Sequence, residues 1–207
     1  MILAAAPDAA LLAKLGEQTL AMENFFNKAS CLVEVAGEEK DGDGKITKSS
    51  KTSVRVSRDG AKVSRKLVSH EEDGKDLTEA KRKEIEGKEA AKVSRSPLHP
   101  TEQTKYRFAL TSDPTRIAFE PVAAKTEDNL AGEALIDVDG ARVLALEMRP
   151  AKLPMFVQEL SIRVDFDADT PSGKGMSTLT VKGLAGALFF KKRFSVTTRF
   201  SDYAALP

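Results

Sequence analysis

The chain has 207 residues, of which 41% are hydrophobic and 30% charged. This length is enough to bury a sizeable core and fits one domain, so a single domain over residues 1–207 is expected. Its 32 basic and 31 acidic residues leave a formal charge of +1, so no global field attracts nucleic acid, which is not an expected partner. Cys31 is the one cysteine, which excludes an intramolecular disulfide; with only two histidines beside it, no structural metal site is expected.

The N-terminus has two interpretations. Small residues before Pro7 are typical of the end of a cleaved export signal. The absence of a basic n-region fits an ordinary start before a helix equally well, so both interpretations stay open. No run of 18 apolar residues occurs, so no membrane-spanning segment is predicted.

A helix is predicted from about residue 8 to residue 26. Asp8 can cap its start, and Leu11, Leu15, Met22 and Phe26 recur at about 3.6 residues. These side chains form one apolar stripe, so the helix must pack on another element.

From residue 30 the apolar period changes to two, which predicts strands with turns at 41–44 and 58–60. The first turn partly resembles a calcium loop, because Asp41, Asp43 and Gly44 fit its spacing. Ser50, however, stands where the bidentate glutamate is needed. A solvated hairpin tip is therefore favoured over a calcium site.

A second helix is predicted as an insertion at about 76–95. Asp76 would be its N-cap, and Glu79 with Lys83 and Glu84 with Lys88 have the spacing of ion pairs along a helix. Its apolar stripe is narrow, so we expect it to lie on the surface or to protrude as a lid.

The last hundred residues predict an antiparallel meander, because period-two segments alternate with turn residues. The longest alternation runs from Phe156 to Phe166 with one apolar face, and the final strand is also long. Strands of this length favour a strongly curved or barrel-like sheet over a flat one. The predicted class is mainly β with helices (α+β).

No residue pattern indicates a reaction. The glycines at 173–175 and 183–186 lack phosphate-loop spacing, and neither His70 nor His99 belongs to a nucleophile or metalloprotease motif. We therefore expect no enzymatic activity and no cofactor. Lys192 in the basic cluster 191–193 shares strand parity with Phe194, which makes it a sheet-edge charge or a polar group at a cavity mouth; the edge is favoured.

One sheet face gathers an excess of large apolar residues, which are the candidate lipid-binding residues. They are Phe108, Leu110, Phe119, Leu160, Ile162, Val164, Phe166, Phe190, Phe194 and Phe200. They form either a core between sheet and helix or the wall of an apolar cavity for acyl chains. Periodicity favours the core but cannot report an unfilled volume.

From Ser96 onward the chain resembles the LolA/LolB-type lipoprotein-carrier superfamily, in particular its outer membrane lipoprotein-sorting branch. The similar segments are Pro97 to Pro100, Tyr106 to Phe108, Arg116 to Pro121, Gly132 to Asp137, Leu153 to Val157, Phe189 to Phe194 and Phe200 to Tyr203. They are spread over just over half of the chain, and the order of helices and strands agrees as well.

The resemblance implies an unclosed β-barrel around the N-terminal and inserted helices, and a periplasmic location. It also implies a carrier of acylated lipoproteins or lipids toward the outer membrane, with inner-membrane release machinery and an outer-membrane acceptor as partners. The alternative is an envelope sensor or assembly factor, as in RseB-type relatives, that binds lipoprotein or lipid in the same cavity without transporting it. The polar helix at 76–95 departs from an apolar lid.

Overall fold

The computed structural model describes residues 5–88, 95–187 and 190–207, and only the backbone of residues 187 and 190. Within these residues one antiparallel sheet has eleven strands in the order β4-β3-β2-β1-β13-β12-β9-β8-β7-β6-β5. The strands are β1 (Lys28–Lys40), β2 (Ile46–Asp59), β3 (Lys62–Glu72), β4 (Lys75–Asp76), β5 (Tyr106–Leu110), β6 (Arg116–Pro121), β7 (Leu130–Asp137), β8 (Arg142–Pro150), β9 (Val157–Asp165), β12 (Thr178–Ala187) and β13 (Phe190–Ala205). A small separate hairpin joins β10 (Ala168–Thr170) to β11 (Gly173–Gly175), and a single 3₁₀ turn, η1 (Gln103–Lys105), precedes β5.

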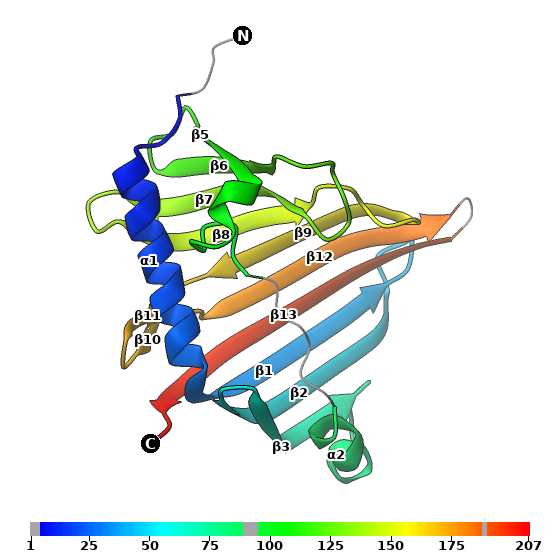
Figure 1. The fold of residues 1–207 in the computed structure, drawn as a ribbon. Coiled ribbons are helices and arrows are strands. Elements are labelled where there is room, and N and C mark those ends of the chain that lie inside the picture. The colour runs from blue at the N-terminus through cyan, green and yellow to red at the C-terminus, as the bar shows by residue number, and fades with distance from the viewer. Residues whose placement is uncertain (1–4, 89–94, 188–189) are drawn as a thin grey trace.

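The sheet bends around α1 (Ala9–Phe26) without closing into a barrel (Figure 1). Its middle strands are long, with 13 residues in β1, 14 in β2 and 16 in β13. Twist accumulates over strands of this length and curls the sheet. The predicted class, an unclosed curved antiparallel sheet with two helices, is confirmed, as is the turn at 41–44. The second turn lies at 60–61 and not at 58–60, because Arg58 and Asp59 still pair with β3.

α1 starts where the sequence predicts. Asp8 caps it, because its Oδ1 accepts a hydrogen bond from the Ala10 N–H at 2.9 Å. Leu15 is fully buried against the sheet, on the side called here the inner face. The core under it also contains Leu98, Ile117, Phe119, Ala134, Ile136, Val143, Leu146, Val164 and Phe166.

The C-terminal end of α1 is fixed to β13 through Tyr203. Its ring packs edge-on against Phe25 and Phe26, with centroids 6.2 and 5.4 Å away. Its hydroxyl donates to the Met176 carbonyl at 2.6 Å, and burial raises the pKa of this phenol. The helix is therefore held by the core at Leu15 and by an aromatic cluster near its end.

The second helix, α2 (Thr78–Glu86), is shorter at its start than predicted. Asp76, the predicted N-cap, lies in β4 instead. Its carboxylate accepts a hydrogen bond at 2.8 Å from the N–H of Thr78, the residue at which α2 begins. The predicted pair of Glu84 and Lys88 is present at 3.3 Å, whereas Glu79 pairs with Arg82 at 2.7 Å. The predicted end at 95 falls beyond residues 89–94, which are outside the described residues.

α2 is polar because it hydrogen-bonds to the edge strand β3. The Arg82 Nη1 donates to the Leu67 carbonyl at 2.9 Å, and Glu86 Oε1 accepts from the Leu67 N–H at 2.9 Å. Thr78 Oγ1 likewise accepts from the His70 N–H at 2.8 Å. These bonds occupy backbone groups that an edge strand would otherwise leave open, so charged side chains suit this helix better than an apolar stripe.

Two expectations about single residues are wrong. Phe156 does not join the apolar face of β9, because it lies in the preceding turn and is 63% exposed. Lys192 is not at a sheet edge, because β13 lies between β1 and β12, and its Nζ is 3.0 Å from Glu39 Oε2 on β1. Alternation along one strand shows neither the order of the strands in the sheet, which decides the place of Lys192, nor the residue at which a strand begins, which decides the place of Phe156.

Candidate ligand-binding cleft

Strand register brings the predicted apolar residues onto the inner face. Phe108 is opposite Phe119, and the same row continues through Gly132 and Met148 to Ile162. The neighbouring rows contain Leu110, Leu160, Val164, Phe194 and Phe200. The side chain of Phe190 lies outside the described residues.

These residues divide into two groups by their surroundings. Phe119, Val164 and Phe166 are buried in the core, and Phe108, Leu110 and Ile162 pack against it. Leu160, Phe194 and Phe200 are only half-buried. The inner face is therefore a packed core at its β5–β8 end and less covered toward β13 and β1.

A cleft of about 1180 Å³ opens where the core ends. It lies between the C-terminal half of α1, the first half of β1, the end of β2, the segment 95–106 and the loop 121–130. Its apolar lining consists of Met22, Phe26, Ala29, Cys31, Val33, Val56, Tyr106, Pro121, Val122, Ala123, Leu130, Phe166, Met176 and Phe200. Of the ten residues predicted from sequence, Phe166 and Phe200 are in this lining.

Charged groups also line the cleft. Arg95 Nε and Nη2 donate to the Glu23 carboxylate at 3.0–3.3 Å, which ties the segment after residue 94 to α1. The hydrogen bond and positive charge of Arg95 lower the pKa of Glu23, against a smaller opposing effect of burial. Arg58 and Lys105 add further cations to the lining.

His99 is buried next to this ion pair rather than in open loop. Its Nδ1 accepts from the Thr101 N–H at 3.2 Å. Its Nε2 lies 3.0 Å from Glu23 Oε2 without the angle of a hydrogen bond. The turn-rich sequence gave no sign of this burial, which comes from the packing of the segment 95–106 on α1.

Cys31 is half-buried in the cleft wall, and desolvation raises the pKa of its thiol. It is the chain's single cysteine, so a change in its reactivity reports on this cleft alone.

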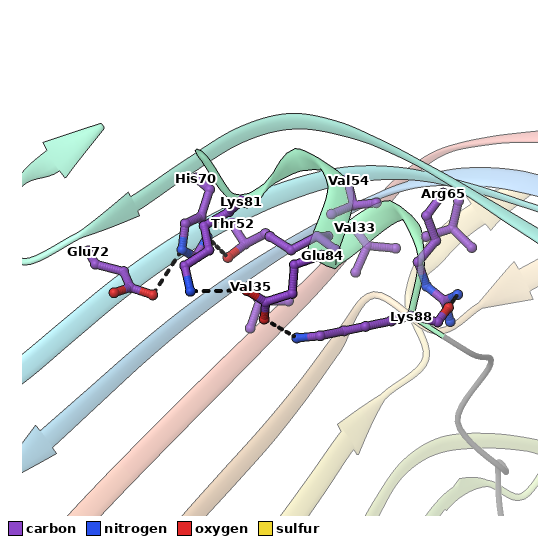
Figure 2. A pocket seen from close by; sticks show the side chains of 12 residues that line it. Val33, Val35, Thr52, Val54, Arg65, His70, Glu72, Lys81, Glu84 and Lys88 are labelled. Carbon is purple, nitrogen blue, oxygen red and sulfur yellow. Dashed lines mark hydrogen bonds and ion pairs between the residues drawn. The ribbon is translucent and has the colours of Figure 1, made fainter. Parts of the chain in front are cut away.

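A second, smaller hollow of about 340 Å³ lies beneath α2 on the same face. Figure 2 shows Val33, Val35 and Val54 on its floor. On the α2 side, Glu84 binds both Lys81 at 3.1 Å and Lys88 at 3.3 Å (Figure 2). Val33 and Val56 line both the hollow and the cleft, so the two are neighbours on one continuous surface.

The other histidine, His70, has a local role in this hollow. Its Nδ1 is 2.8 Å from Thr52 Oγ1 and its Nε2 is 3.1 Å from Glu72 Oε1 (Figure 2). In the described residues, no group of three or more His, Cys, Asp or Glu side chains is placed to hold a metal ion. At the calcium-like turn, Asp41 Oδ1 accepts from the N–H groups of Asp43 and Lys45, as in a hairpin tip.

Sequence reasoning missed most of the cleft. Met22 packs against the core as the apolar stripe predicts, but Met22 and Phe26 also line the cleft, which the stripe does not show. Val33 and Val56 lie in segments that the sequence predicts as strands, and the period of two does not distinguish them from other strand residues.

No family model matches the sequence, and no curated protein matches it either. Two solved structures are similar over 96% of this chain and 100% of theirs. One is the Pseudomonas aeruginosa MucA/MucB complex, with 9% identity and a TM-score of 0.23. The other is MucB in complex with MucA(peri), with 10% identity and a TM-score of 0.26. At such low scores the likeness carries no argument about what this chain binds.

None of the helices in the described ranges is long and apolar enough to cross a bilayer.

Proposed function

We propose that the chain is a non-covalent carrier that binds the acyl chains of lipoproteins or lipids in the cleft. The observation that supports this most directly is a cavity of about 1180 Å³ whose lining is largely apolar and also contains charged side chains. Ordinary small-molecule sites span roughly 300–1,000 Å³, so this volume is large enough for extended chains.

The amphipathic lining suits an amphiphile. Each methylene moved from water onto Val33, Phe166 and Phe200 contributes about 0.8 kcal/mol. The polar end of the ligand would stay near Arg95 and Lys105, where water and charged groups solvate it. Acyl binding in this way needs no bond to form or break, and we propose that the protein is not an enzyme.

Delivery completes the proposal. Following the resemblance to the LolA/LolB-type carriers, we propose that the chain acts in the periplasm and passes its ligand to an outer-membrane acceptor. Such transfer requires that the acceptor bind the acyl chains at least as well as the cleft does. An envelope sensor would bind the same ligand without passing it on, so a transfer assay separates the two functions.

Cys31 provides the test of binding. We expect palmitate or a diacylated peptide to slow the modification of Cys31 by a maleimide in a saturable manner, because the chains would cover the thiol. Val33→Glu places a charge on the cleft floor and should abolish this protection. Val68→Glu is the matched control, because Val68 is 55% exposed on β3.

Both variants are first checked for folding by circular dichroism, and Val33→Thr serves as a milder change. Full protection in a folded Val33→Glu protein would contradict the proposed cleft. Transfer of a fluorescent acylated peptide from the loaded protein to acceptor vesicles then tests carriage, and binding without any transfer would favour the sensor.

A further inference from the structure

The turn between β8 and β9 presents two large apolar side chains to solvent. Met155 is 78% exposed and Phe156 is 63% exposed. They occupy the two middle positions of a turn that is closed by a hydrogen bond from the Val157 N–H to the Pro154 carbonyl at 3.1 Å. Large apolar residues are seldom adjacent at a turn, where polar residues and glycine dominate.

The backbone of this turn is also strained. Phe156 has a φ of +67°, a region that bulky side chains rarely adopt. Turns with a positive φ at their third position usually place glycine there. The conformation is held by the Gly186 N–H, which donates to the Phe156 carbonyl at 2.8 Å. Phenylalanine therefore occupies an unfavourable backbone conformation while most of its side chain is in solvent, and this combination points to a partner outside the chain.

Cations lie beside the apolar pair. Gly186 pairs with Lys191 on β13, which places Lys191 two strands from Phe156, roughly 10 Å away. Lys191 and Arg193 are both exposed, and Glu159 is an exposed acidic neighbour on β9. The chain as a whole has a charge of only +1, so any attraction to an anionic surface must come from local groups such as these.

We infer that the turn from Pro154 to Val157 docks the protein onto the surface of a bilayer that contains anionic lipids. Aromatic and thioether side chains enter the interfacial layer, while lysine and arginine remain with the headgroups. The turn lies at the end of the sheet away from α1 (Figure 1). This inference is independent of the proposed acyl binding, because it concerns a different surface.

The test is sedimentation with vesicles of phosphatidylglycerol and phosphatidylethanolamine at low salt. Phe156→Gly should weaken vesicle binding at least about tenfold, because one buried phenylalanine contributes that much affinity. The same variant should unfold at the same or a higher temperature than the wild type, because glycine relieves the positive φ. Lys191→Gln should weaken binding about fivefold on these vesicles and have little effect on phosphatidylcholine vesicles.

Val68→Ser is the matched control, because it removes an apolar side chain of similar exposure on β3 and should leave binding unchanged. The inference is overturned if the folded wild-type protein does not sediment with anionic vesicles, as expected for a turn that binds a protein partner. It is also overturned if Phe156→Gly binds as tightly as the wild type, or if that variant is less stable.

Discussion

Replacing Leu15 by alanine is expected to lower the free energy of unfolding by about 3–5 kcal/mol. Leu15 is 0% exposed and belongs to the core cluster under α1. Loss of its methylene groups accounts for roughly 2 kcal/mol at about 0.8 kcal/mol each. The cavity left behind supplies the rest, because the neighbouring side chains are fixed by strands and collapse only partly.

Leu20 on the same helix provides the control. It is 39% exposed, so Leu20→Ala should lower the free energy of unfolding by about 1 kcal/mol or less. Urea denaturation monitored by circular dichroism measures both variants, and thermal unfolding should show a decrease of roughly 6–20 °C for Leu15→Ala. Equal losses in the two variants would refute the docking of α1 through Leu15.

Two further predictions concern the inner face and the charged lining of the cleft. Gly183→Ala should destabilise the protein by about 1–3 kcal/mol, because a Cβ there would lie 2.6 Å from Phe194 Cε1; an unchanged denaturation midpoint would show that the ring can move aside. The pKa of Glu23 is lowered in the folded protein by Arg95, so the carboxylate contributes stability above its ordinary pKa of 4.5 that is lost as the pH falls through the folded value. The stability difference between the wild type and Glu23→Gln should therefore be larger near pH 6 than near pH 3, and denaturant titrations with a pH-independent difference would contradict this linkage.

The sequence predicts those parts of the fold that depend on local chemistry. Asp8 and the leucine spacing place α1 within a residue, and the glycine-rich turn at 41–44 fixes the first hairpin. Period-two alternation assigns the strands of the meander and the side on which Phe119 and Val164 lie. These features are encoded within a few residues of each other.

Features that depend on distant contacts were not predictable. Asp76 is a sound cap by sequence, yet it lies in β4, where it pairs with Glu71 of β3, and α2 begins at Thr78. The alternation from Phe156 onward continues through a turn whose conformation is set by hydrogen bonding, not by polarity. The cleft was missed because alternation shows which side of a strand a residue occupies but not whether anything fills the space above it.

The hydrogen bonds of α2 along β3 have a counterpart at the other border of the sheet. There the Leu110 N–H of β5 donates to the Ala5 carbonyl of the N-terminal segment at 2.8 Å. A closed barrel satisfies its borders by joining them, whereas this sheet satisfies backbone groups of each border with separate pieces of chain. Because neither border pairs with the other, a change in the distance between them would break no strand pairing.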